Sequence, residues 1–380
     1  MKPAFGGHLN EIRFICIDNF KDWGYIYAYF LTHFHGDHIC GIDDLSLLRL
    51  LKRKNIYIYT SEVTVAIITA RYPHLTPHLR SLRLGRNALS IPTRDKEEFL
   101  EVTVLPAGHS LGSVMYLFEY ENQKILFTGD FRISKNDVAK YKHLQNNGEP
   151  IQIDALYVDT TFQDKPYIPK RSEVVSNLIP HISKWLAENE KNKVVLSVSA
   201  MFGYEGACNQ IYDEIKIKAN VNEDDWAIYR QFPKQIYGVT NEESRIALRK
   251  KNKERIPEHT LDVVFSALSW TSPNLDEKFL VKEGLQRIKV CYSTHCGRDE
   301  LIHFINYLKP RRIKGFPEDL KENSCKLSRR SIFTDKDSDA NENFEISPKK
   351  RKIVRDNNGK ENCKKSEVVK RRLGDVLDWG

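Results

Sequence analysis

Three histidines and one aspartate lie within six residues of this sequence, in Thr32-His33-Phe34-His35-Gly36-Asp37-His38. Imidazole and carboxylate groups are ligands that zinc and similar divalent ions prefer, and no thiolate accompanies them. The cluster follows an apolar segment, so we expect it in the loop after a strand, with a turn at Gly36 that directs its side chains to two metal ions. The alternative is a surface histidine cluster, which matching residues further along the chain disfavour.

Two single residues complete the candidate metal site. His109 follows an apolar segment in Pro106-Ala-Gly-His109, and Asp130 does so in Phe127-Thr-Gly-Asp130. Taken alone, a histidine after a strand is usually structural, and an aspartate after a glycine usually belongs to a turn. With the cluster, they supply a third histidine and a bridging carboxylate. Two metal ions ~3.5–4 Å apart that share a carboxylate can promote in-line displacement at phosphorus.

The elements that must position these residues change in character along the chain. The first 135 residues read as short strands rich in β-branched and aromatic side chains, with one helix over 63–72. Beyond residue 165, helices and strands alternate, as in an α/β unit with parallel strands. The expected strands cover residues 25–31, 56–59, 102–105, 114–118, 124–127, 155–158, 193–198 and 288–292, and the further helices cover residues 172–189, 206–218 and 299–308.

Composition limits the class of protein. The chain has 380 residues, 41% of them hydrophobic and 29% charged, and no apolar run approaches the ~18 residues of a membrane span. The first residues lack the apolar stretch of a secretory signal. The seven cysteines are odd in number and form no Cys-x-x-Cys pair. We therefore expect a protein of a reducing compartment, without membrane association and without a disulfide framework.

The positive charge is concentrated near the C-terminus. Of the net charge of +8, residues 321–380 carry +5, from 16 basic and 11 acidic residues, which leaves +3 on residues 1–320. This segment has little apolar content, so we expect it to be disordered. A basic block in Ser347-Pro-Lys-Lys-Arg-Lys-Ile-Val354 is typical of a nuclear localisation signal, although solvated charge runs are common. The signal would comprise Lys349, Lys350, Arg351 and Lys352.

The metal motifs resemble those of the metallo-β-lactamase superfamily. Asp18, in Phe14-Ile-Cys-Ile-Asp18, is similar to its first motif. The segments Leu105–Met115, Phe127–Arg132 and Leu156–Phe162 look like those of the β-CASP branch that processes DNA, the DNA cross-link repair family. The resemblance covers about residues 11–310. It implies an α/β (α+β) fold, in which a metallo-β-lactamase αββα sandwich carries an inserted α/β β-CASP domain.

The resemblance also implies a domain organisation. Residues 1–158 would form the first part of the metallo-β-lactamase domain, and residues 159–287 the β-CASP insert. Residues 288–320 would complete the metallo-β-lactamase domain, and residues 321–380 would be the basic tail with the nuclear localisation signal. DNA would lie in the groove between the domain and its insert.

Carried over residue by residue, the resemblance implies roles for the site. His33, His35, His109 and Asp130 would hold one tightly bound zinc ion. Asp37, His38 and Asp130 would face a second divalent ion, with Mg²⁺ or Mn²⁺ as candidates. Asp18 would orient a ligand from outside the first shell. Water activated by the metal would attack the phosphodiester and leave a 5′-phosphate.

Asp159 and His295 follow two further apolar segments. Taken alone, Asp159 would most simply cap the next element, and His295 would be an ordinary loop histidine. In the family, an aspartate at this place orients a histidine beside the scissile phosphate. A carboxylate partner raises the basicity of an imidazole, so His295 would stabilise charge on the phosphate or protonate the leaving oxygen.

The resemblance implies a DNA nuclease, endonuclease or 5′→3′ exonuclease, in double-strand-break or cross-link repair in the nucleus. The Ser-x-His motif of the family is here Ser293-Thr-His295. RNA-processing relatives carry a further histidine downstream of it, near the end of the nuclease core. The last histidine of this sequence is His303, in the helix expected directly after the motif, so residues 304–380 contain no such ligand. An RNA-processing hydrolase and a catalytically inert scaffold that binds DNA ends are the alternatives. The implied partners are DNA ends, hairpins, overhangs or single strands, and a repair kinase or ligase complex. We expect a monomer.

Overall fold

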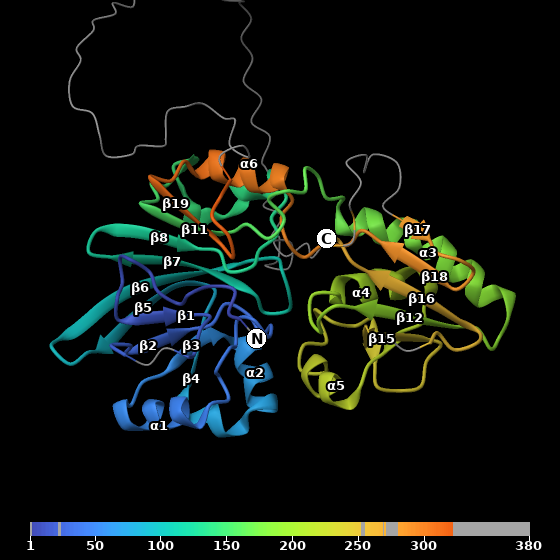
Figure 1. The fold of residues 1–380 in the computed structure, drawn as a ribbon, viewed down its shortest axis with the longest axis horizontal. Coiled ribbons are helices and arrows are strands. Elements are labelled where there is room, and N and C mark those ends of the chain that lie inside the picture. The colour runs from blue at the N-terminus through green and yellow to red at the C-terminus, as the bar shows by residue number, and fades with distance from the viewer. Residues whose placement is uncertain (1, 22–23, 252–254, 269, 271–279, 322–380) are drawn as a thin grey trace, which may run out of the picture. The chain divides into compact units, whose positions relative to one another are not determined.

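The computed structural model describes residues 2–21, 24–251, 255–268, 270 and 280–321. They form three main sheets with helices on their outer faces (Figure 1). The nuclear localisation signal predicted at residues 349–352 lies outside the described residues. Among those that are described, no helix has the length and apolar composition needed to span a bilayer.

The first sheet has four strands in chain order, and every neighbouring pair is parallel. Its strands are β1 (Ile15–Ile17), β2 (Ala28–Phe30), β3 (Ile58–Ser61) and β4 (Leu79–Leu82). Its helical connections are α1 (Leu45–Lys54), α2 (Glu62–Arg71) and the 3₁₀ segment η1 (Pro73–His78). α1 was not predicted. Asp44 is its N-cap residue, and the Asp44 side chain accepts a hydrogen bond from the Ser46 amide. The helix buries Leu47, Leu50 and Leu51.

The second sheet has six strands in the order β19-β11-β8-β7-β6-β5. β5 to β8 form an antiparallel meander, whereas β11 and β19 are parallel to β8. The bounds are β5 (Gly85–Pro92), β6 (Glu97–Pro106), β7 (Val114–Tyr120), β8 (Gln123–Phe127), β11 (Ala155–Asp159) and β19 (Arg312–Phe316). Between β8 and β11 lie η2 (Lys135–Lys140), η3 (Lys142–Leu144) and a small hairpin of β9 (Gln145–Asn146) and β10 (Glu149–Pro150).

These two sheets pack face to face over a shared apolar core. Phe30 of β2, for example, contacts Tyr116 and Phe118 of β7, with ring centroids 5.4 and 5.1 Å apart. A second cluster joins α1 and α2 to the outer face of the first sheet, and a third joins α6 (Arg298–Leu308) to that of the second sheet. The order of layers is therefore helix, sheet, sheet, helix, which confirms the αββα sandwich.

The third sheet forms the second part of the fold, in the order β14-β13-β15-β12-β16-β18-β17. All its pairs are parallel except β17 with β18. Its strands are β12 (Lys193–Val198), β13 (Ala219–Asn220), β14 (Val239–Thr240), β15 (Ile246–Lys250), β16 (Thr260–Phe265), β17 (Leu280–Lys282) and β18 (Arg287–Val290). Its helices are α3 (Arg171–Glu188), α4 (Glu205–Ile215) and α5 (Glu223–Tyr229). The mixed α/β architecture of an inserted unit is thus as predicted.

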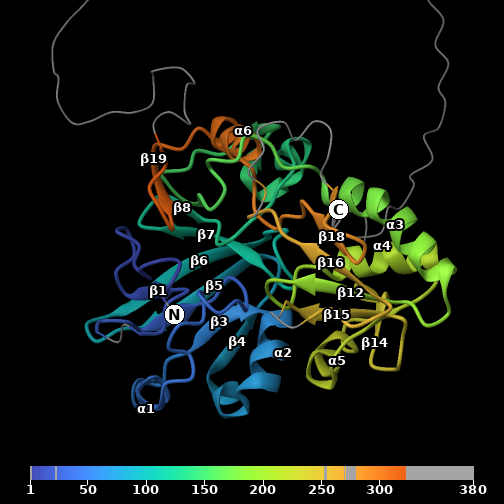
Figure 2. The same ribbon diagram turned by 45° about the vertical axis from the view of Figure 1, so that its right-hand side comes forward.

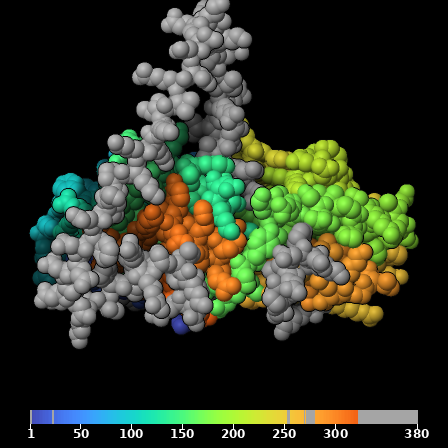
Figure 3. Space-filling view, turned by 90° about the horizontal axis from the view of Figure 1, so that it is seen from above, coloured from blue at the N-terminus to red at the C-terminus, as the bar shows by residue number. Residues whose placement is uncertain are grey.

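One strand lies elsewhere than expected. Residues from 288 on were assigned to the C-terminal part of the first domain, but β18 pairs with β16 in the third sheet. Its Ile288 and Val290 are buried in that sheet's core. The chain crosses back only after β18, and α6 and β19 then join the first domain. In Figures 2 and 3 the orange residues accordingly occur on both parts of the molecule. The sheet that a strand joins depends on its pairing with strands distant in sequence, so the local pattern at residues 288–292 does not predict it.

Candidate metal centre

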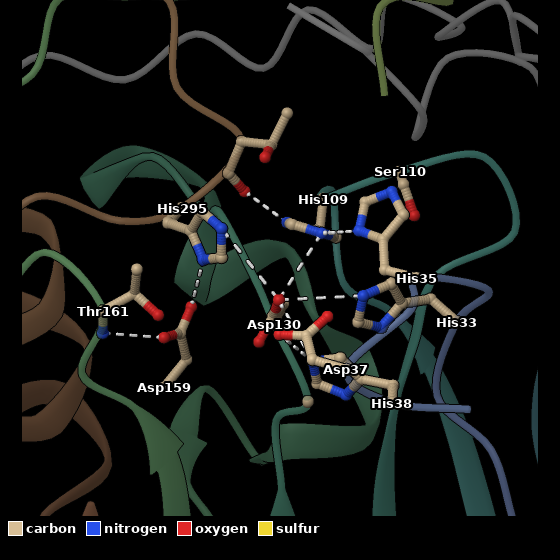
Figure 4. A network of polar contacts seen from close by, with 12 residues as sticks. His33, His35, Asp37, His38, His109, Ser110, Asp130, Asp159, Thr161 and His295 are labelled. Atoms are coloured by element: carbon tan, nitrogen blue, oxygen red, sulfur yellow. Dashed lines mark hydrogen bonds and ion pairs between the residues drawn. The ribbon is translucent and has the colours of Figure 1, made fainter. Parts of the chain in front are cut away.

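The chemistry-bearing residues lie in loops that leave the strands at one edge of the sandwich. His33, His35, Asp37 and His38 follow β2, and His109 lies between β6 and β7. Asp130 follows β8, and Asp159 is the last residue of β11. His295 lies in the loop between β18 and α6. Figure 4 shows their side chains around Asp130. The structure thus brings together all the residues that the sequence singled out within its described part.

Four side chains offer a compact set of metal ligands. One ligand atom from each of His33, His35, His109 and Asp130 lies within 4.8 Å of all the others. The Asp130 Oδ2 atom is 3.7 Å from His33 Nε2 and 3.6 Å from His109 Nε2. Apart from His35, which is partly exposed, these side chains are buried. Three imidazoles and a carboxylate are a donor set suited to zinc or a similar divalent ion.

Main-chain carbonyl groups fix the orientation of two of these imidazoles. His35 Nε2 lies 3.2 Å from the Met201 oxygen and 3.3 Å from the Phe202 oxygen, and His109 Nδ1 lies 2.9 Å from the Thr294 oxygen. A carbonyl oxygen only accepts hydrogen bonds, so these ring nitrogens carry the protons. The opposite nitrogens, His35 Nδ1 and His109 Nε2, then face each other 3.0 Å apart with lone pairs. A cation bound by both nitrogens would remove their repulsion.

A buried network orients the other two imidazoles. Asp18 accepts from the Thr32 amide at 2.8 Å, from the Thr32 hydroxyl at 2.7 Å and from His38 Nδ1 at 2.8 Å. Because the Thr32 hydroxyl donates to Asp18, its oxygen accepts from His33 Nδ1 at 2.9 Å. His33 Nε2 and His38 Nε2 are buried and have no hydrogen-bond partner among the described residues. Buried polar atoms normally have partners, so these two fit metal ligation.

His38 and Asp37 define a second position beside the first. His38 Nε2 lies 3.3 Å from Asp130 Oδ2 and 3.9 Å from Asp37 Oδ2. Asp130 therefore stands between both groups, as a bridging carboxylate would. The Asp37 side chain is 46% exposed, so this position is open on one side.

The charges of the site follow from burial and proximity. Burial and neighbouring imidazoles lower the pKa of both His33 and His109 well below its usual value. Neutral imidazole is the form that binds metal. Burial opposes ionisation of Asp130, but His38 and His295 more than offset this and hold its pKa well below the usual range. Burial lowers the pKa of His38, but Asp130 and Asp18 raise it well above its usual value. His33 and His109 are thus the neutral donors beside the carboxylate.

Asp159 and His295 form a pair next to this centre. His295 Nδ1 lies 2.7 Å from Asp159 Oδ2, and Asp159 Oδ1 accepts from the Thr161 amide at 2.8 Å. Burial lowers the pKa of His295, but Asp159 and Asp130 raise it to about 9. Its Nε2 atom lies 3.9 Å from Asp130 Oδ2. In its charged form this imidazole donates protons. Asp130, Asp159 and His295 also offer ligand atoms within 4.8 Å of one another, so the neutral ring could ligate a metal ion there.

Arg132, two residues after Asp130, was missed as a site residue by sequence reasoning. Its guanidinium is buried and donates to the Ser293 oxygen at 3.0 Å, to the Pro169 oxygen at 2.9 Å and to Glu300 Oε1 at 3.3 Å. Pro169 and Ser293 lie on the outgoing and returning crossings between the two parts of the fold. Arg132 therefore ties both crossings to the loop that carries Asp130. The only sequence signal was its place in the motif Phe127–Arg132.

The chain matches two family domains that together cover most of this site. Residues 20–182 match the beta-lactamase superfamily domain, and residues 226–315 match the DNA repair metallo-beta-lactamase domain. The chain therefore belongs to the metallo-β-lactamase superfamily, in its DNA repair branch. This confirms the predicted family.

Among curated proteins, the chain is similar to protein artemis of Gallus gallus, with 29% identity over 333 residues. That match covers 80% of this chain and 46% of the relative. DNA cross-link repair 1A protein of Gallus gallus is 24% identical over 314 residues, 75% of this chain and 30% of the relative. 5′ exonuclease Apollo of Danio rerio is 29% identical over 155 residues, 40% of this chain and 25% of the relative. The chain spans about half the length of the artemis protein.

A solved structure supports the fold independently. A protein of unknown function from Enterococcus faecalis V583 superposes with a TM-score of 0.50 and 15% identity. The match covers 81% of this chain and 79% of the other. At this identity the likeness concerns the fold alone.

Proposed function

We propose that the chain is a metal-dependent DNA nuclease that acts in double-strand-break or cross-link repair. The observation that carries the proposal is the convergence of ring nitrogens from His33, His35, His38 and His109 on the Asp130 carboxylate. The family and its relatives, named for DNA repair and for 5′ exonuclease activity, support DNA as the substrate. Cleavage within a strand and from a 5′ end are both included.

His33, His35, His109 and Asp130 hold zinc in the first position. Asp37, His38 and Asp130 face a second divalent ion, zinc, Mg²⁺ or Mn²⁺. Asp18 fixes the tautomer of His38 directly and that of His33 through the Thr32 hydroxyl. Divalent ions in such a site polarise the phosphate and lower the pKa of water toward ~7.

The remaining residues act on the phosphate and the leaving group. Asp159 holds the His295 ring with its Nδ1–H directed at the carboxylate, so that Nε2 faces the centre. The proton on Nε2 neutralises charge on the phosphate or passes to the leaving 3′ oxygen, with cleavage to a 5′-phosphate. The Asp37 side chain is 46% exposed, so the DNA strand reaches the second position from this side.

Two alternatives have specific tests. RNA processing is disfavoured because no histidine follows His303 in the chain. A scaffold without catalysis is disfavoured because the ligand set is intact. The nuclear location and a kinase or ligase partner complete the proposal, on the basic block at residues 349–352 and on the repair relatives.

The test is an activity assay of the purified chain on labelled single-stranded DNA, hairpin DNA and RNA. Cleavage of DNA that is lost in Asp37→Ala supports the proposal. Cleavage of RNA alone favours the RNA-processing alternative. No cleavage by the zinc-loaded chain, with binding of DNA ends intact, favours the scaffold. Asp43→Asn, an exposed carboxylate on the loop before α1, is the control and keeps full activity.

A further inference from the structure

A single stretch of the first domain carries a large excess of positive charge. Residues 45–92, from the start of α1 to the end of β5, contain eight lysines and arginines and only one acidic residue, Glu62. Their net charge of +7 exceeds the +3 of residues 1–320 as a whole, so the rest of that range is negative on balance. Such a separation of charge within one domain marks a binding surface for a polyanion.

The helix α1 places three of these charges on its outer face. Lys52 and Arg53 lie three and four residues after Arg49, and all three side chains are exposed. The apolar residues of α1 are buried against the sheet, so its charged residues lie on the opposite face of the helix, toward solvent.

The edge strand β4 continues the charge next to α1. Arg80 lies with its guanidinium 3.7 Å from the centre of the Tyr57 ring, and its Nη1 atom donates to the Leu79 oxygen at 2.8 Å. The Tyr57 hydroxyl donates at 2.9 Å to Asn55, which ends α1. Burial and then the charges of Lys52 and Arg80 lower the pKa of His78, between the two elements. The guanidinium is thus held in place beside α1 before any partner arrives.

One end of this surface, at Arg83, lies at the metal-bearing edge, and α1 runs from that edge toward the opposite one. β2, β3 and β4 are parallel, so their carboxyl ends meet at the same edge of the sheet. His33 follows the end of β2 by three residues, and Arg83 follows the end of β4 by one. Figures 1 and 2 show α1, α2 and β4 together on this part of the first domain. We define the basic face by Arg49, Lys52, Arg53, Arg80 and Arg83.

These five side chains are available to a partner. None of them forms an ion pair with another residue that the structure describes, and all five are exposed. The four-residue strand β4 alone spans ~13 Å, the length of several phosphates at about 3.4 Å each along one DNA strand. Guanidinium groups bind phosphate oxygens in pairs.

We propose that the basic face binds the sugar–phosphate backbone of the DNA duplex that flanks the cleaved strand, at a distance from the metal centre. This inference rests on the proposed function, which supplies DNA as the partner. Contacts of this kind go to phosphates, so they are independent of base sequence and sensitive to salt. They hold the duplex while the strand to be cleaved enters the metal site.

The test measures duplex binding by the full chain in EDTA, by fluorescence anisotropy over a range of salt concentrations. The variant is Lys52→Gln, Arg53→Gln and Arg80→Gln together. The control removes the same charge from exposed insert residues, as Lys184→Gln, Lys234→Gln and Lys250→Gln. Each phosphate contact contributes ~0.9 to the slope of log affinity against log salt, so the variant should lose about 2 to 3 in slope. The control should keep the slope of the unmodified chain.

Several outcomes overturn the proposal. A variant with the slope of the control shows that the basic face does not contact DNA. Loss of binding to an acidic polypeptide such as polyglutamate, with DNA binding unchanged, assigns the face to an acidic protein. If the unmodified chain binds no duplex, this proposal fails, and cleavage of single-stranded DNA by the zinc-loaded chain decides the proposed function separately. If it binds through the basic face but cleaves nothing after loading with zinc, only the proposed function fails.

Discussion

His38 donates its Nδ1–H to the carboxylate of Asp18 across 2.8 Å, and neither side chain is exposed to solvent. The same carboxylate oxygen accepts the Thr32 hydroxyl, whose oxygen faces His33. One buried aspartate therefore sets the orientation of two imidazoles that belong to the two metal positions. Asp18 adopts a positive φ of 52°, which is uncommon for a residue other than glycine.

Asp18→Asn should weaken zinc binding ~10- to 100-fold. Both carboxylate oxygens of Asp18 accept hydrogen bonds from Thr32 and His38, whereas the asparagine amide has only one accepting oxygen. The measurement is competition with a chromophoric chelator. Asp43→Asn, which changes the same kind of group on an exposed loop, should leave the affinity as it was. An unchanged zinc affinity in Asp18→Asn would show that the network does not orient the ligands.

His295→Ala should reduce turnover much more than metal content, because its Nδ1 is bonded to Asp159 and its ring is held charged. Loss of a general acid typically lowers the rate ~10²- to 10⁴-fold. His35→Ala should reduce both turnover and zinc content. Metal analysis of the two purified variants decides the point. If His295→Ala lost zinc as completely as His35→Ala, then His295 would be a ligand.

Arg132→Ala should destabilise the fold by ~3–5 kcal/mol, because it leaves Glu300 buried without its partner. Arg132→Lys keeps the charge but cannot reach Ser293, Pro169 and Glu300 together. It should retain more stability than Arg132→Ala and bind zinc, yet turn over at least about 10-fold more slowly, since a misplacement near 1 Å is costly. Urea unfolding, metal content and kcat test this. Arg311, which is exposed and pairs with Asp154, offers a control, because Arg311→Lys should change none of the three.

Replacement of Lys349, Lys350, Arg351 and Lys352 by alanine should move a fluorescently tagged chain out of the nucleus. The reason is that import receptors read the clustered charge of such blocks. Replacement of Lys326, Arg329, Arg330 and Lys336 removes the same charge from the same tail and serves as the control. Unchanged nuclear signal in the first variant would discard the import reading.

The sequence located the candidate ligands because their motifs are local, and the structure brings His33, His35, His109 and Asp130 together. The cluster after β2 needs only one turn to bring together His33, His35, Asp37 and His38. Each of the other two candidate ligands, His109 and Asp130, directly follows an apolar segment typical of a strand. The partners of these ligands were not predictable in the same way. Met201, Phe202 and Thr294 contribute main-chain oxygens, and a main-chain oxygen leaves no trace in the residue type.

The fold shows the same division. Strands such as β7 and β12 are buried and apolar, and the sequence located them closely. β5 was missed, since it lies at an edge with alternate residues exposed and has few β-branched side chains. The sheet to which β18 belongs depends on its pairing with β16, which is not a local property. The basic face was hidden because negative charge elsewhere in residues 1–320 cancels most of it in a sum.

The most direct test of the central claim is the metal content of the chain purified without added metal, measured by mass spectrometry. The account predicts about one tightly held zinc per chain, with a second divalent ion that a chelator removes or that added Mg²⁺ or Mn²⁺ replaces. Two chelator-resistant ions would contradict only the weak second position. A folded chain that contains no zinc and takes up no divalent ion on titration would contradict the metal centre and the nuclease proposal with it.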